Sequence, residues 1–178
     1  MPSETLFPTS IEGTPVNLVS PTVAEVNEDI DTGSPDTDFH EYDTGTNNVE
    51  IRYGFDDPTG DLTSGATQNF RVRMRKSASG GQDPSVILRL YEGGTDTGVS
   101  STTSVTNDTT FAEYNLTWTV ASLTAASGTN AEFFIEQNSG ANSGNPNSRR
   151  GIEISAVNWD LDFQFNPGGQ PESNVVWV

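Results

Sequence analysis

The sequence predicts an all-β fold, an antiparallel β-sandwich of about seven or eight strands in one domain. Apolar residues recur with a period of two in several short segments, and only residues 120–126 have enough helical character for about one turn. The chain has 17 Gly and 10 Pro, many of which lie between the apolar clusters and mark turns. Hydrophobic residues make up 32% of the 178 residues, which suits a thin two-layered sandwich with polar loops.

The strands of the first half are predicted from alternation. The clearest spans residues 69–76, where three apolar residues alternate with three arginines. Residues 48–55 alternate in the same way and lead into a turn-rich segment at 56–61. Residues 85–91 are apolar on both faces, which is typical of a central strand, and residues 92–95 then turn the chain.

Three strands are predicted in the second half, at residues 114–120, 131–137 and 152–163. In the last of these, the apolar residues change from even to odd positions near Ser155. A β-bulge produces such a slip, because one extra residue restores the inward face. The long polar segment 138–150 is expected to be a loop at one end of the sandwich.

The chain divides by composition into three parts. Residues 1–47 contain acidic residues but no Lys or Arg, and we expect a strand near residues 5–7 followed by a surface excursion of the same domain. Residues 48–165 form the body of the sandwich. Residues 166–178 are a linker with an apolar, β-prone tip, which is expected to pair with a sheet edge, preferably in a neighbouring molecule. The tip residues expected to bind a partner are Val175, Val176 and Trp177.

The charge balance restricts the partners. With 25 acidic and 8 basic residues, the net charge is −17, which disfavours nucleic acid and anionic membranes and favours cationic partners or divalent metals. There is no cysteine, so disulfides and thiolate metal sites are excluded. No secretory signal is expected, because the N-terminus has neither a basic region nor an apolar run. No apolar stretch approaches the length of a membrane span.

Catalysis is not expected. His40 is the only histidine, and no nucleophile motif accompanies it. A catalytic role is therefore not expected, and His40 is predicted to be a surface or turn histidine. Pairs of carboxylates, which glycosidases require, arise by chance among 25 acidic residues. The chain is therefore interpreted as a protein that binds or assembles, and not as an enzyme.

Two acidic loops offer the oxygen ligands that calcium prefers. They span residues 28–38 and 56–61, and neither matches an EF-hand loop. The candidate ligands are Asp29, Asp31, Asp56, Asp57 and Asp61. The alternative is that both are solvated acidic loops without an ion, and no other cofactor is expected.

Four arginines form the most unusual feature of the sequence: Arg71, Arg73, Arg75 and Arg89. The first three, called the arginine stripe below, share one face of a strand, and the fourth is expected beside them on a following strand. Since like charges at alternate positions repel, an acidic partner is expected. Either residues of the same chain, such as Glu50 or Glu153, neutralise the stripe, or the arginines contact a partner protein.

The aromatic residues bear on carbohydrate binding, which commonly uses exposed rings. Trp118 and Trp159 have the inward parity of strong strands and are expected in the core. Tyr42, Tyr91 and Tyr114 are candidate members of an exposed platform.

Several motifs together resemble a known domain. They are Thr5-Leu6-Phe7-Pro8-Thr9, Tyr53-Gly54-Phe55, the strand 70–75 with the run 87–94, and the segments 111–120 and 160–163. This layout, over roughly residues 4–163, resembles a jelly-roll-like domain of structural proteins of tailed phages. The Trp-rich segment that commonly follows the opening strand in that family is missing. The resemblance implies a jelly-roll-like fold and a place in the virion, and it supplies no catalytic residues.

We therefore expect a non-enzymatic structural protein of a tailed-phage virion, made in the host cytoplasm. The favoured role is a capsid decoration or cement protein that binds the major capsid protein and stabilises the head. A neck or tail protein and a carbohydrate-binding or host-adhesion module are the alternatives. A homo-oligomer is expected, and a trimer by analogy with other projecting jelly rolls.

Overall fold

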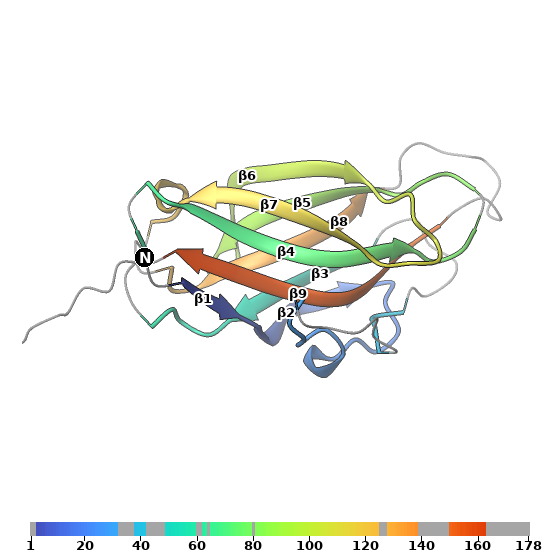
Figure 1. Ribbon diagram of the computed structural model, residues 1–178, viewed down its shortest axis with the longest axis horizontal. Helices are drawn as coiled ribbons and strands as arrows, with labels where there is room; N and C mark the ends of the chain where they lie inside the picture. Colours follow the sequence, from blue (N-terminus) through green and yellow to red (C-terminus); the bar gives the residue numbers. More distant parts are fainter. Residues whose placement is uncertain are drawn as a thin grey trace, which may run out of the picture.

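Two antiparallel sheets pack face to face in the computed structural model (Figure 1). It describes residues 3–31, 38–41, 49–59, 62–63, 65–79, 81–124, 128–138 and 150–162. The strands in this part of the chain are β1 (Ser3–Leu6), β2 (Pro8–Val16), β3 (Glu50–Phe55), β4 (Thr67–Lys76), β5 (Ser85–Glu92), β6 (Thr95–Ser104), β7 (Ala112–Thr119), β8 (Ala131–Asn138) and β9 (Ile152–Asp162). Two short 3-10 helices complete it, η1 (Val23–Glu25) and η2 (Val120–Ser122). In these ranges no helix is long and apolar enough to cross a membrane.

The order of the strands is that of a jelly roll with one strand added. One sheet has the order β1-β9-β4-β7 and the other has the order β2-β3-β8-β5-β6. Without β2, the first, eighth, third and sixth strands form one sheet, and the second, seventh, fourth and fifth form the other, as in a jelly roll. All neighbouring pairs are antiparallel. The predicted all-β, jelly-roll-like sandwich is thus confirmed.

Two strands, β2 and β6, form in segments where the sequence pattern predicts none. Both lie at an edge of the five-stranded sheet. β2 contains Pro8, Gly13 and Pro15, and its pairing with β3 is interrupted by register shifts. β6 consists of polar residues and glycine except for Val99. Edge strands commonly carry proline and polar residues, so the alternation that reveals a half-buried strand is weak in them.

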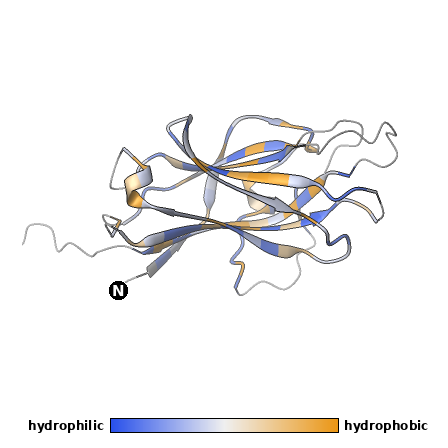
Figure 2. Ribbon diagram, turned by 90° about the horizontal axis from the view of Figure 1, so that it is seen from above, coloured by the Kyte–Doolittle hydropathy of each residue, from blue (hydrophilic) through white to orange (hydrophobic). Residues whose placement is uncertain are grey.

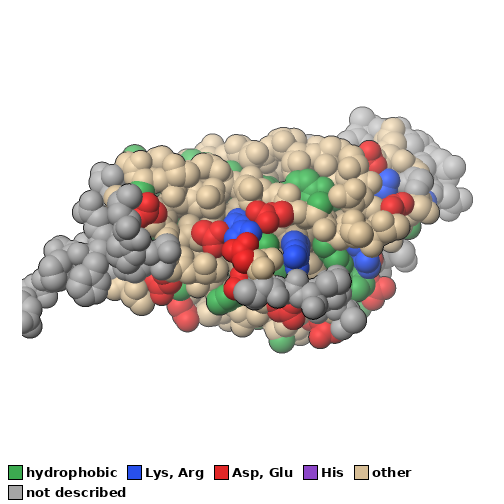
Figure 3. Space-filling model, in the orientation of Figure 1, with side chains coloured by type: hydrophobic (Ala, Val, Ile, Leu, Met, Phe, Trp, Pro, Cys, Tyr) green, Lys and Arg blue, Asp and Glu red, His purple; other side chains and the backbone are tan. Residues whose placement is uncertain are grey.

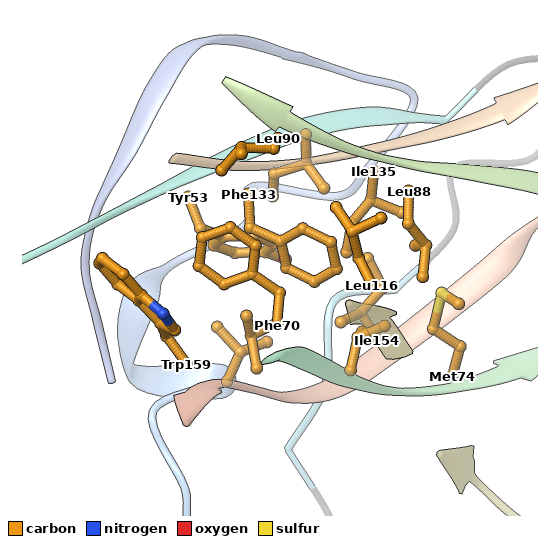
Figure 4. Packing of buried hydrophobic residues seen from close by; sticks show 14 of the residues in the cluster. Tyr53, Phe70, Met74, Leu88, Leu90, Leu116, Phe133, Ile135, Ile154 and Trp159 are labelled. Atoms are coloured by element: carbon orange, nitrogen blue, oxygen red, sulfur yellow. The ribbon is translucent and has the colours of Figure 1, made fainter. Parts of the chain in front are cut away.

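Aromatic and aliphatic side chains fill the space between the sheets (Figure 4). The rings of Phe70 from β4 and Phe133 from β8 stack across the two layers with their centroids 4.8 Å apart. Trp118 and Trp159 are 3% and 1% exposed, which confirms their predicted place in the core. Figure 2 shows the two layers from above, with hydrophobic and hydrophilic residues alternating along many strands.

The predicted bulge lies in β9. Arg73 pairs with Ala156 and Met74 pairs with Ile154, so Ser155 is the extra residue. Consequently Ile154 and Val157 are both fully buried although they are three positions apart.

The segment between β2 and β3 lies along β9. The backbone N–H of Val157 donates to Val26 O, and that of Ile30 donates to the Asn158 side chain. His40 forms an isolated antiparallel bridge with Ile154. This packing places Asp31 and Phe39 next to the outer face of the four-stranded sheet.

Candidate binding surfaces

Arg71 is the centre of an ion-pair cluster on the outer face of the four-stranded sheet. Its guanidinium lies 2.7 Å from Asp31, 2.9 Å from Glu113 and 2.9 Å from Asp160. These carboxylates come from the segment after η1, from β7 and from β9, so one cation joins three parts of the chain. The hydrogen bond from Arg71 lowers the pKa of Asp31, while the pKa of Arg71 itself is raised by its carboxylate partners.

Arg75 is also held within the chain. Its Nε lies 2.6 Å from Glu153, one of the two partners proposed from the sequence. Its guanidinium lies over the rings of Phe39 and Phe111, 4.8 and 4.5 Å from their centroids. Burial raises the pKa of Glu153, and the hydrogen bond and charge of Arg75 oppose this rise. At both ends, then, the arginine stripe ties the segment before β3 to the sheet.

Arg73 lies between these two clusters, and its situation differs. It is partly exposed, and within the described residues it forms no ion pair. Its direct cross-strand neighbour on β7 is Glu113, whose two carboxylate oxygens both accept hydrogen bonds from Arg71. Figure 3 shows the basic side chains of this face, some of them flanked by acidic ones. Arg73 is therefore the member of the stripe that is best placed to meet a carboxylate of another molecule.

The expectation that Arg89 lies beside the stripe was wrong. Arg89 belongs to β5, which is part of the five-stranded sheet, so it lies on the opposite face of the sandwich. It lies 3.2 Å from Glu136 and 3.3 Å from Asp96. The sheet to which Arg89 belongs depends on pairing between strands that are distant in the chain, and the pattern along one strand does not reveal that pairing.

The predicted calcium ligands are not gathered into one site in the described part of the chain. Asp29 accepts a hydrogen bond from the backbone N–H of Asp31, and Asp31 itself is bound to Arg71. Asp56 and Asp57 are exposed in the segment after β3, and Asp61 lies outside the described residues. Within those residues, no group of three or more His, Asp or Glu side chains has the arrangement of a metal site.

Sequence reasoning missed a cluster on the outer face of the five-stranded sheet. Arg52 on β3 lies 2.9 Å from Glu132 on β8, without the alignment of a hydrogen bond, and its guanidinium lies 5.5 Å from the ring centroid of Tyr91. Tyr91 in turn contacts Phe134, with 5.1 Å between ring centroids. Arg52 thus covers a face of the tyrosine that was a candidate sugar platform. Tyr114, another candidate, packs against the core.

The other residues singled out in the sequence either lie outside the described ranges or are buried. Tyr42, Val175, Val176 and Trp177 lie outside the described residues. His40 is fully buried, which corrects the expectation of a surface histidine. Its Nε2 donates to Thr22 O at 2.8 Å, and its Nδ1 accepts a hydrogen bond from the Tyr53 hydroxyl at 2.9 Å. Both ring nitrogens are therefore occupied by bonds that hold the fold.

Comparison with known proteins yields similar structures but no family. No family model and no curated protein matches the chain. A CBM35 from Paenibacillus barcinonensis is 15% identical, with 90% of this chain and 99% of that chain covered and a TM-score of 0.43. The enzymatically active domain of tailspike protein 4 of bacteriophage CBA120 is 12% identical, and the match covers 89% of this chain and 19% of that chain with a TM-score of 0.45. An arabinose-bound α-L-arabinofuranosidase is 15% identical, and the match covers 69% of this chain and 22% of that chain with a TM-score of 0.40. These TM-scores are too low to assign a function to this chain.

Proposed function

We propose that this chain is a non-enzymatic structural protein of a tailed-phage particle, a decoration protein that binds the major capsid protein on the outside of the head. The placement on a phage particle rests on the resemblance carried by the sequence motifs. The structure contributes a candidate contact, because Arg73 is a partly exposed cation without an ion-pair partner in the described part of the chain.

Arg73 is suited to such a contact for two reasons. Its neighbours Arg71 and Arg75 are held by their own partners, so these two flanking side chains are already ordered before a partner binds. An arginine guanidinium can also bind a carboxylate through two parallel hydrogen bonds, and arginine is enriched in protein interfaces. In a protein with 25 acidic and only 8 basic residues, an arginine that forms no ion pair within the described part of the chain is an unusual feature, which an acidic partner would explain.

The location is tested first by mass spectrometry and immunogold labelling of purified virions. Regular labelling over the head, with many copies per particle, supports a decoration protein. Labelling confined to the tail or to one vertex replaces it with a tail or neck protein. The absence of the chain from particles refutes the virion proposal.

The contact is tested by binding of the recombinant chain to phage heads that lack it. We expect Arg73→Glu to weaken binding at least about tenfold, or about 1.4 kcal/mol, and raised salt to weaken the wild-type interaction. Arg89→Glu makes the same charge change on the opposite face and serves as the matched control. Equal binding of wild type and Arg73→Glu, with both folded by circular dichroism, refutes the role of Arg73. Deleting residues 166–178 tests the predicted tip in the same assay.

A further inference from the structure

A polar pocket opens at the end of the sandwich where β5 and β7 end and β6 and β8 begin, on the left in Figure 1. Its volume is about 530 Å³, within the range of small-molecule sites, roughly 300–1,000 Å³. The side chains that matter for its chemistry are those of Glu92, Thr95, Asp96, Ser122, Thr124 and Asn130, and we call it the end pocket. Neither the arginine stripe nor the Arg52 cluster contributes to it.

The walls of the end pocket are tied to one another by hydrogen bonds. The Glu92 carboxylate accepts hydrogen bonds from the backbone N–H of Thr124 at 2.8 Å and from its hydroxyl at 2.6 Å. The backbone N–H of Gly93 donates to Asn130 O at 3.0 Å. The end of β5, the segment after η2 and the residues before β8 are therefore held in place without a ligand. Such order reduces the entropy that binding would otherwise cost.

Asn130 has an uncommon backbone conformation for a residue that lines a pocket. Its φ of +63° lies in the left-handed region, where glycine is less strained than any residue with a side chain. Asparagine tolerates this region better than most residues, so the conformation alone is not evidence of a site. Here, however, Asn130 is one of the residues that line the pocket, and its side-chain amide has both a donor and an acceptor to offer a ligand.

The polar groups of the end pocket determine which ligands it suits. Hydroxyl and amide groups both donate and accept hydrogen bonds, as sugar hydroxyls do. No Lys or Arg is among the residues that line the pocket, so a phosphate, sulfate or uronate would meet carboxylates without a compensating cation. Arg89 lies 3.3 Å from Asp96 and offsets its charge, which weakens the attraction for a cation. We propose that the end pocket binds an uncharged polyhydroxylated ligand, a neutral saccharide unit.

The test is a binding titration of the full chain, by saturation-transfer NMR and calorimetry, against two panels of sugars. One panel contains neutral oligosaccharides of glucose, galactose, mannose and N-acetylglucosamine, and the other contains oligosaccharides with uronic acid or sulfate groups. We expect at least one neutral sugar to bind at millimolar or lower concentration and the charged panel not to bind. Binding of no neutral sugar at these concentrations, or binding of the charged panel alone, overturns the proposal.

Three variants locate the site. Asn130→Gly removes the amide while keeping the backbone conformation accessible, and we expect it to weaken neutral-sugar binding at least about tenfold. Glu92→Gln is expected to do the same, whereas Glu50→Gln makes the same change on β3, outside the pocket, and should bind as wild type. Unchanged sugar binding in both pocket variants overturns the assignment. It is also overturned if calorimetry shows that calcium binds in the absence of sugar and that removing calcium abolishes sugar binding. These results are independent of whether the chain is found on virions.

Discussion

His40 lies in the core with both ring nitrogens hydrogen-bonded, so replacing it by phenylalanine removes two bonds while keeping a ring of similar size. The Tyr53 hydroxyl is fully buried and would lose its partner, which costs about 1–3 kcal/mol. The Thr22 carbonyl keeps a second hydrogen bond, from the backbone N–H of Glu25 at 3.2 Å, so the loss of the bond from His40 costs only about 0.5–1.5 kcal/mol. We therefore expect His40→Phe to lower the free energy of unfolding by about 1.5–4.5 kcal/mol at pH 7.5.

The size of this effect should depend on pH. Burial lowers the pKa of His40 below its usual 6.5, although the hydrogen bond to Thr22 and the charge of Glu25 oppose the shift. Below pH 6.5 the unfolded chain therefore binds a proton that the folded protein resists, and the wild type loses stability as the pH falls toward the folded-state pKa. The loss is at most about 1.4 kcal/mol per pH unit for one proton. Because His40→Phe lacks this group, its deficit relative to wild type should shrink below pH 6.5.

The assay is urea unfolding of both proteins at several pH values between 7.5 and 5.0, followed by tryptophan fluorescence. The comparison cancels contributions shared by both proteins, including those of Glu132 and Glu153, whose pKa values are raised by burial. Tyr53→Phe combined with His40→Phe removes the orphaned hydroxyl, so the double variant should cost less than the sum of the single changes. A difference between wild type and His40→Phe below about 0.5 kcal/mol, or one that does not change with pH, would refute this reasoning.

Three further predictions concern stability. Gly128 has a φ of +75°, and an added Cβ would lie 3.0 Å from the Trp159 ring. Gly128→Ala should therefore lower the free energy of unfolding in urea by at least about 2 kcal/mol, and a neutral effect would contradict the packing. Arg71→Lys keeps the charge but loses the planar guanidinium, which binds several carboxylates at once. Because two of the three carboxylate partners are more than one-third exposed, we expect the free energy of unfolding to fall by only about 1 kcal/mol, and by less at high salt. Leu116→Ala should cost about 2–5 kcal/mol, whereas Thr119→Ala on the exposed face of the same strand should change stability by less than about 0.5 kcal/mol; equal costs in thermal melts would show that the register of β7 is wrong.

Features that depend on residues close together in the chain could be predicted from the sequence. Alternation located the strands that carry a buried face, and it placed Trp118 and Trp159 in the core. The slip of parity near Ser155 predicted the bulge in β9, because an extra residue changes the local period whatever strand lies alongside. The outward direction of the arginine stripe followed from the same alternation.

The neighbours of each strand become visible only in the folded chain, and the candidate sites depend on them. The sequence could not show that Arg89 lies on the opposite sheet from Arg71, or that Asp31, 40 positions away in the chain, is its partner. His40, predicted on the surface or in a turn, is buried because the segment before β3 packs on β9. The end pocket likewise joins three segments that share no sequence motif. Side-chain parity is set by the local backbone, whereas strand order is set by pairing between distant residues, and a single sequence carries little information about that pairing.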